Sequence, residues 1–220
     1  DSMVLPLIKY LESHQVAIQY DTTVQNVIVT TKGAEKHAEK LLLTVKGAPQ
    51  EINLTDNDLV FVTNGSITES TTYGDHHTPA PVSKAVGGSW QLWENLAKQS
   101  PDFGHPKVFY KNIPAKSWFV SATATIENTA VDPYIERLTK RDLHDGKVNT
   151  GGIITVTDSS WDLSFTIHRQ PHFKNQKPNE TVVWIYALYS DTEGDYIHKK
   201  ITDCTGEEIT QEWLYHLGVP

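Results

Sequence analysis

The chain has 220 residues, of which 38% are hydrophobic and 21% charged, so it is long enough for a sizeable core and too apolar for wholesale disorder. A formal net charge of −8, without any run of lysine or arginine, argues against a partner nucleic acid. The longest apolar run, Val182–Leu188, is too short to span a bilayer. The single cysteine, Cys204, fits a reducing compartment, the cytoplasm, and is expected to be a structural residue.

The N-terminal quarter of the chain predicts one helix and four short strands. Apolar residues recur on one helical face at Val4, Leu7, Ile8 and Leu11. Alternating or β-branched segments then predict strands at Val16–Tyr20, Val24–Thr30, Lys40–Val45 and Glu51–Leu54. Glycine-containing turns separate the last three strands, which indicates a small antiparallel meander. Neither end of the chain resembles a natural domain boundary, so we expect an internal piece of a longer protein.

A further strand, predicted to be buried and parallel, spans Leu59–Val62 and runs directly into the polar turn Thr63, Asn64, Gly65 and Ser66. In open α/β sheets, ligands bind beyond the carboxyl ends of the parallel strands. This segment therefore predicts backbone and hydroxyl groups that face a cofactor. A mixed α/β domain that binds no cofactor explains the same pattern equally well.

A loop follows at Asp75–Gly88, rich in histidine, proline and glycine. Its neighbouring histidines, His76 and His77, have no third ligand at a set spacing, so we expect solvated side chains and no metal ion. Beyond the loop, the patterns predict a helix at Ser89–Gln99, strands within Lys107–Thr125 and a short helix at Asp132–Thr139.

The C-terminal part of the chain predicts a largely antiparallel sheet closed by a helix. Strands are expected at Ile153–Thr157, Trp161–Ile167 and Val182–Tyr189, and the helix at Glu207–Leu217. The fold class expected for the whole chain is therefore α+β, or mixed α/β. Aromatic residues in this part suggest either the lining of a tunnel for a long apolar ligand or ordinary core packing: Trp118, Phe119, Trp161, Phe165, Trp184, Tyr186 and Tyr189.

The densest polar cluster of the sequence is Thr166–His172. Thr166 and His168 share one face of an extended segment, and His172 follows after a proline that makes a helical metal motif improbable. Together these three side chains offer several hydrogen bonds to one anion, such as a carboxylate. The alternative is an edge strand whose polar residues merely face water, and the pattern alone favours that alternative.

Four long stretches of the chain resemble the oleate hydratases, also known as the myosin-cross-reactive antigen family: Asn57–Asp75, Gly87–Phe109, Asp158–Phe173 and Glu193–Gly218. The resemblance implies a bacterial, FAD-containing hydro-lyase that adds water across the cis-9 double bond of oleate to give 10-hydroxystearate. In the family, a glutamate and a tyrosine catalyse this step in segments upstream of Asp1. The chain is therefore expected to contain no catalytic residue and to be inactive alone.

The resemblance also implies binding roles for particular residues. The family segment TxNRQPH recognises the carboxylate of an unsaturated fatty acid, and it maps onto Thr166, His168 and His172, with His168 in place of the usual asparagine. Residues 1–75 would form part of a two-dinucleotide-type FAD-binding domain, and residues 76–220 an antiparallel substrate-binding region with helices. A homodimer of the full-length protein and peripheral contact with a membrane are further expectations.

For FAD, the resemblance implies contacts at Thr63, Asn64, Gly65 and Ser66, and a contact of the adenine end with Val24. Two other functions agree with the residues. The first is a related flavoprotein in which FAD performs redox or isomerising chemistry, and the second is a non-catalytic lipid-binding module. Product analysis with oleate separates the redox flavoprotein from a hydratase, because hydration needs no oxidant and leaves a hydroxyl group.

Overall fold

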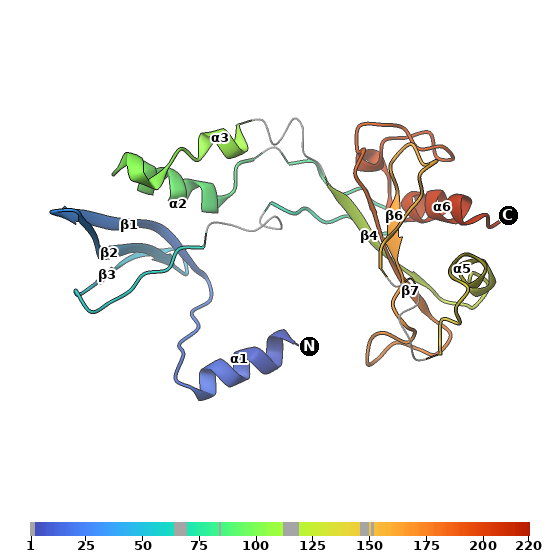
Figure 1. The fold of residues 1–220 in the computed structure, drawn as a ribbon, viewed down its shortest axis with the longest axis horizontal. Helices are drawn as coiled ribbons and strands as arrows, with labels where there is room; N and C mark the ends of the chain where they lie inside the picture. The colour runs from blue at the N-terminus through green and yellow to red at the C-terminus, as the bar shows by residue number, and fades with distance from the viewer. Residues whose placement is uncertain (1–2, 64–69, 84, 112–118, 146–149, 151) are drawn as a thin grey trace. The chain divides into compact units, whose positions relative to one another are not determined.

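The computed structural model describes residues 3–63, 70–83, 85–111, 119–145, 150 and 152–220 (Figure 1). The chain divides into two compact units. Unit 1 contains Asp1–Ser70 and Val86–Lys111, and unit 2 contains Thr71–Ala85 and Asn112–Pro220. Helices and antiparallel sheets occur in both parts of the chain, which confirms the α+β class. Residues 86–111 pack with unit 1, whereas the sequence placed them in the substrate-binding region.

Unit 1 is built on a three-stranded antiparallel sheet in the order β1-β2-β3. The strands are β1 (Thr22–Lys32), β2 (Glu35–Val45) and β3 (Ala48–Asn53), which confirms the predicted meander. Only two residues, Lys46 and Gly47, join β2 to β3, with φ angles of 47° and 82°. Two successive positive φ angles match the right-handed twist of the flanking strands and make a tight hairpin.

A helix, α2 (Gly88–Ala97), packs against β1 at the position predicted from the sequence. Its Leu96 is buried, as are Val27 of β1 and Leu43 of β2. Just beyond α2, the Gln99 amide accepts a hydrogen bond from the Val29 N–H at 3.0 Å and donates one to the Val27 carbonyl at 2.9 Å. These bonds satisfy backbone groups on the free edge of the sheet.

Two short helices follow α2, η1 (Pro101–Phe103) and α3 (Lys107–Tyr110), and α3 lies where the sequence predicted strands. The strand expected within Lys107–Thr125 begins only at Val120. Pro101 starts the first turn and Pro106 precedes the second. Proline has a φ angle suited to the start of a helix, which explains why helical turns replace extended backbone.

Two predicted strands of unit 1 are absent from the described part of the chain. Val16–Tyr20 and Leu59–Val62 have no regular secondary structure and pair with no other strand. Leu59 and Phe61 are 83% and 86% exposed, so the prediction of a buried parallel strand was wrong. An extended apolar segment becomes a strand only when a neighbour accepts its backbone hydrogen bonds, and the sequence does not show that neighbour.

The predicted N-terminal helix is present as α1 (Val4–Ser13) and has no buried residues. In the ranges that the structure describes, no helix has both the length and the apolar character needed to cross a membrane.

Unit 2 contains a four-stranded antiparallel sheet in the order β4-β7-β6-β5. The strands are β4 (Val120–Ile126), β5 (Ile154–Thr155), β6 (Ser164–Thr166) and β7 (Thr181–Ala187). Two helices, α5 (Asp132–Thr139) and α6 (Gly206–Leu217), pack on one side of the sheet (Figure 1). A short turn, η2 (Ile201–Asp203), precedes α6.

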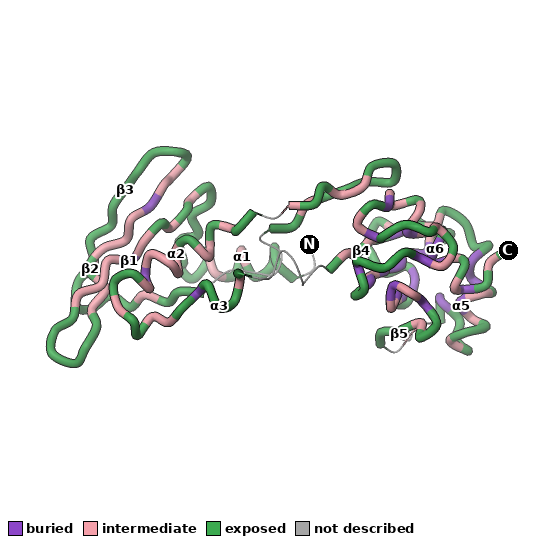
Figure 2. The backbone as a smooth tube through the Cα atoms, turned by 90° about the horizontal axis from the view of Figure 1, so that it is seen from above, coloured by how far each residue is buried: buried purple, intermediate pink, exposed green. Residues whose placement is uncertain are grey.

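Buried residues concentrate in unit 2 (Figure 2), where the core contains side chains from the sheet and from both helices. Trp161 and Phe165 are buried there, and the Phe165 ring lies edge-on to Trp213 of α6 with centroids 5.8 Å apart. Cys204 belongs to the same core. Burial, followed by the nearby Glu208, raises the pKa of the Cys204 thiol to about 12, which agrees with a structural rather than a nucleophilic role.

Candidate functional site

The three residues predicted to bind a carboxylate line one pocket of unit 2, with a volume of about 180 Å³. Thr166 is the last residue of β6, and His168 and His172 lie on the segment that follows it. The rest of the lining comes from the neighbouring strands and from that same segment: Thr123, Phe173, Val182 and Trp184. The lining therefore combines two imidazoles and two hydroxyl groups with three apolar side chains.

The two imidazole rings stack on each other, with centroids 4.5 Å apart and an interplanar angle of 23°. His172 also meets the ring of Phe173 edge-on at 4.9 Å. Both histidines are exposed, and no described residue forms a hydrogen bond with a ring nitrogen of either. These nitrogens are therefore free to donate hydrogen bonds to a ligand in the pocket.

The Thr166 hydroxyl has protein partners of its own. Its Oγ1 atom donates to the Gly152 carbonyl at 3.1 Å and lies 3.2 Å from the Thr150 hydroxyl. A ligand would gain a hydrogen bond from Thr166 only if this hydroxyl turned away from Gly152. The two histidines are therefore the stronger donors of the predicted set.

A buried glutamine holds the histidine-bearing segment in place, and the sequence analysis did not identify it. Gln170 is fully buried, and its amide nitrogen donates to the carbonyls of His168 at 2.7 Å and Val182 at 3.2 Å. Its Oε1 atom accepts from the Val182 N–H at 3.0 Å and from the Gln176 amide at 2.5 Å. A buried amide with all its groups bonded fixes the backbone on which both histidines stand.

Gln176 continues this network at the other end of the segment. Its Oε1 atom accepts hydrogen bonds from the backbone N–H groups of His172 at 2.8 Å and Phe173 at 3.2 Å. One sequence signal indicated a supporting role for Gln170. It lies inside the matched segment TxNRQPH, between two positions predicted to bind the carboxylate.

The sequence left open whether the aromatic residues line a tunnel or pack in the core, and the structure places some of them in the core and others outside it. Trp161 and Phe165 belong to the core, whereas Trp184 and Tyr186 lie with Phe119 outside the fully buried core. The Trp184 and Tyr186 rings are 4.9 Å apart, and Phe119 lies 5.5 Å from Tyr186. Trp184 also lines the pocket, so part of the aromatic set can contact an apolar ligand there. Trp118 lies outside the described residues.

A second pocket, of about 350 Å³, lies in unit 1, and Val62, the residue before Thr63, is part of its lining. Val60 and Val62 line it, together with side chains from β1, β2, α2 and η1: Val27, Val29, Lys36, Ala38, Trp93, Leu96 and Phe103. Its cation, Lys36, is paired with Asp102 at 2.5 Å. The described lining is thus apolar and suits a flat ring better than a pyrophosphate.

The residues predicted to contact FAD are only partly described. Thr63 is exposed and directly follows Val62, which lines the pocket of unit 1. Asn64, Gly65 and Ser66 lie outside the described residues. Val24 is half-buried in β1 opposite Leu43 and does not line this pocket.

Known proteins resemble the chain over its full length. Oleate hydratase of Streptococcus pyogenes serotype M49 (strain NZ131) is 69% identical over 220 residues, which is 100% of this chain and 37% of that protein. Linoleate hydratase of Lactiplantibacillus plantarum is 34% identical over 231 residues, which is 99% of this chain and 39% of that protein. The chain thus spans well under half the length of these relatives. Because the MCRA family matches residues 1–220, the chain belongs to the MCRA family.

Proposed function

We propose that this chain is the part of a fatty-acid double-bond hydratase that binds the substrate carboxylate, and that the whole protein converts oleate to 10-hydroxystearate. The observation that carries the proposal is the pocket lined by Thr166, His168 and His172, in a chain 69% identical to an oleate hydratase. A carboxylate has about four acceptor sites, and hydrogen bonds to it from a protonated imidazole are stronger than neutral ones.

The size of the pocket limits what it holds. Pockets that enclose a whole drug-sized ligand measure about 300–1,000 Å³, whereas this one measures about 180 Å³. It therefore accommodates the carboxylate and the first methylene groups, with Phe173, Val182 and Trp184 against the hydrocarbon. The double bond of oleate, many carbon atoms away, would lie outside it.

The chemical step places its own requirements on the whole protein. Hydration of an isolated alkene needs a carboxylic acid that protonates the double bond and a water molecule held in a dry channel. The resemblance places these groups upstream of Asp1. The role of this chain is therefore to fix one end of the substrate, so that the double bond is held in one position.

We also propose that the whole protein binds FAD, and that Thr63, Asn64, Gly65 and Ser66 contribute to its site. The apolar pocket next to Thr63 suits a ring system of the cofactor, and Val24 is proposed for the adenine end. FAD makes no net redox contribution to hydration. Measuring flavin retention in full-length protein that carries Thr63→Ala or Val62→Asp tests this assignment separately from substrate binding.

Replacing His172 with alanine in the full-length protein is expected to weaken oleate binding about tenfold or more. A hydrogen bond to a charged group contributes about 1.5–3 kcal/mol, and about 1.4 kcal/mol corresponds to a factor of ten. Calorimetric titration with oleate measures the affinity, and mass analysis of the products measures 10-hydroxystearate. The matched control is the exposed His105→Ala in unit 1.

Unchanged affinity in His172→Ala would contradict the carboxylate site. Product analysis of the unmodified protein separates the alternatives. A hydroxylated product formed without an oxidant indicates a hydratase, whereas turnover that needs an oxidant indicates a redox flavoprotein. Binding of oleate without any product indicates a lipid-binding module.

Histidine in place of asparagine at position 168 predicts binding that depends on pH. An imidazole can carry a positive charge, whereas the amide of asparagine cannot. A charged imidazole pairs more strongly with a carboxylate than a neutral donor does, so we expect oleate to bind more tightly at mildly acidic pH than it would with asparagine at this position.

The measurement is the pH profile of oleate affinity for the full-length protein and for His168→Asn. The variant is expected to have a flatter profile with similar affinity above neutral pH, because asparagine donates a hydrogen bond without a charge. His105→Asn is the matched control. Identical profiles for the variant and the unmodified protein would show that His168 does not contribute its charge.

A further inference from the structure

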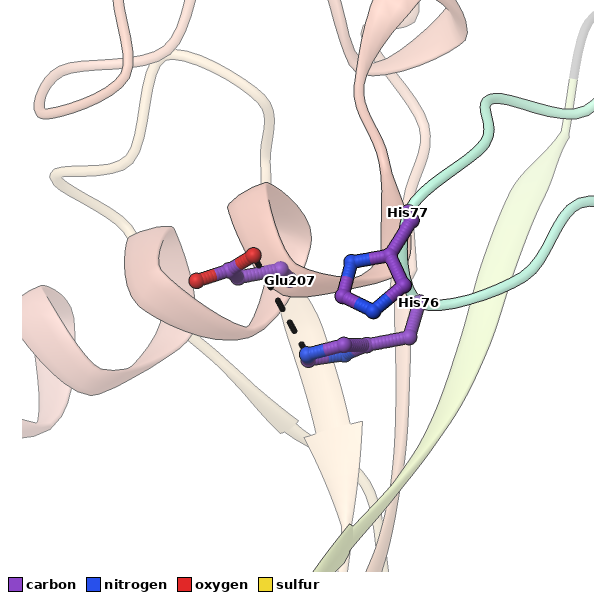
Figure 3. Close-up of side chains that lie close together, drawn as sticks. All are labelled: His76, His77 and Glu207. Atoms are coloured by element: carbon purple, nitrogen blue, oxygen red, sulfur yellow. Dashed lines mark ion pairs between the residues drawn. The ribbon is translucent and has the colours of Figure 1, made fainter.

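Three potential metal ligands lie together on the surface of unit 2, and none of them lines the pocket proposed for the carboxylate. They are His76 and His77 of the loop before Thr78, and Glu207 in the first turn of α6 (Figure 3). One ligand atom of each residue lies within 4.8 Å of the others, and His76 Nε2 is 3.9 Å from Glu207 Oε2. The structure thus supplies the third ligand that sequence spacing did not reveal.

The backbone holds the loop against the helix independently of these side chains. The N–H groups of Gly206 and Glu207, at the start of α6, donate to the carbonyls of Asp75 and His76 at 2.9 and 3.0 Å. A Cβ atom at position 206 would lie 3.0 Å from the Asp75 carbonyl oxygen, so glycine permits this close approach. The loop carrying both histidines is therefore fixed where Glu207 begins its helix.

Hydrogen bonds within the loop fix its shape as well. The Asp75 carboxylate accepts from the N–H groups of His77 at 2.9 Å and Thr78 at 2.8 Å, and the Asp75 N–H donates to the Thr78 carbonyl at 2.9 Å. Ligands held in place before binding lose less conformational entropy when a metal arrives.

We propose that His76, His77 and Glu207 bind one divalent transition metal ion of the zinc class. Imidazole nitrogen and carboxylate oxygen are established zinc ligands, and three protein ligands leave a fourth position for water. Bond lengths of about 2.0–2.1 Å place adjacent tetrahedral ligand atoms about 3.3 Å apart. The side chains of His76 and Glu207 are 64% and 50% exposed, so they can move the short remaining distance. Two imidazoles disfavour magnesium and calcium, which prefer oxygen.

A second group of ligand-type side chains, Asp195, Glu212 and His216, has a structural explanation instead. Both side-chain oxygens of Glu212 accept backbone hydrogen bonds. Asp195 Oδ2 accepts from the Ser160 N–H, and Asp195 Oδ1 accepts from the Ser160 hydroxyl. A metal there would displace bonds that hold the fold. The oxygen of Glu207 nearest His76 has no such backbone partner among the described residues.

Titration of the purified, chelator-treated chain with cobalt(II) and zinc(II) tests the proposal. We expect one cobalt ion per chain with visible absorption typical of four ligands, displacement by zinc, and a higher unfolding temperature with zinc. Loss of a side chain that only hydrogen-bonds to a metal ligand already costs about 10–100-fold in metal affinity, and loss of a ligand itself costs at least as much. His76→Gln, His77→Gln and Glu207→Gln are therefore each expected to weaken binding at least tenfold, while His105→Gln leaves it unchanged.

Each substitution keeps the backbone bonds between the loop and α6, and circular dichroism verifies that the variants fold. Equal binding by the unmodified chain and by His77→Gln would overturn the site. Binding that depends on both histidines and survives Glu207→Gln would also overturn it, because the neighbouring imidazoles would then act without the helix. No saturable binding by the unmodified chain would have the same consequence. None of these outcomes depends on fatty-acid binding.

Discussion

Replacing Glu212 with alanine is expected to lower the free energy of unfolding of unit 2 by about 3–5 kcal/mol, the range observed when one member of a buried polar or ionic network is removed. Glu212 is fully buried in α6. Its Oε1 atom accepts from the Asp195 N–H at 2.7 Å, and its Oε2 atom accepts from the N–H groups of Tyr196 at 3.0 Å and Ile197 at 2.8 Å. Alanine would remove the acceptor of all three N–H groups.

The loop held by Glu212 has a second attachment that makes the network cooperative. His216 Nε2 lies 3.2 Å from Glu212 Oε1 and 3.2 Å from Asp195 Oδ2, and the Ser160 hydroxyl donates to Asp195 at 2.5 Å. Loss of Glu212 therefore weakens the positions of several groups at once. Space is also restricted there, since a Cβ atom at Gly194 would lie 2.8 Å from Glu212 Oε2.

Denaturant unfolding followed by tryptophan fluorescence and circular dichroism measures the effect. Gln211→Ala, on the exposed side of the same helix, is the control and is expected to change stability by less than about 0.5 kcal/mol. Glu212→Gln keeps the volume but presents an NH₂ group where oxygen now accepts, so it is also expected to destabilise the unit. If Glu212→Ala unfolds at the same denaturant concentration as Gln211→Ala, the network does not stabilise the fold.

Sequence patterns predicted unit 2 well because its elements carry their own periodicity. Alternation from Trp161 to Phe165 marks side chains that are buried, and the apolar face of α6 is centred on Trp213, as observed. The same kind of reasoning failed for Leu59–Val62. Whether an apolar run becomes a buried strand depends on a neighbouring strand that the run itself does not specify.

The features of the candidate site likewise include some that the sequence predicted and some that it did not. The period of two in an extended chain predicted that Thr166 and His168 share a face, and both line the observed pocket. The matched segment contains Gln170, but its supporting role was not predicted, because its partners Val182 and Gln176 are brought to it only by the folded chain. The short distance between Glu207 and His76 likewise depends on backbone hydrogen bonds between the loop and a helix that lies far from it in the sequence.

Alanine at Trp161 is expected to lower the free energy of unfolding of unit 2 by about 3–5 kcal/mol, the usual cost of truncating a buried large aromatic residue. Trp161 is fully buried, and its indole N–H donates to the carbonyls of Thr192 at 3.0 Å and Lys199 at 3.3 Å. Truncation would remove both the packing and the bonds that anchor the turn after β7. Thermal and denaturant unfolding of the variant measure the loss.

The matched control is Trp184→Ala, because Trp184 is the same residue type but is partly exposed, whereas Trp161 is fully buried. Trp184 is 36% exposed on β7, between the buried neighbours Val183 and Ile185, and it lines the pocket beside His168. Exposed cross-strand aromatic contacts contribute about 0.2–1 kcal/mol, so the stability of this variant should change little. Its oleate affinity in the full-length protein should fall, since the substrate chain loses its apolar wall. If Trp184→Ala instead unfolded unit 2 as strongly as Trp161→Ala, the aromatic face would be core, and the hydrocarbon contact proposed for it would lose its support.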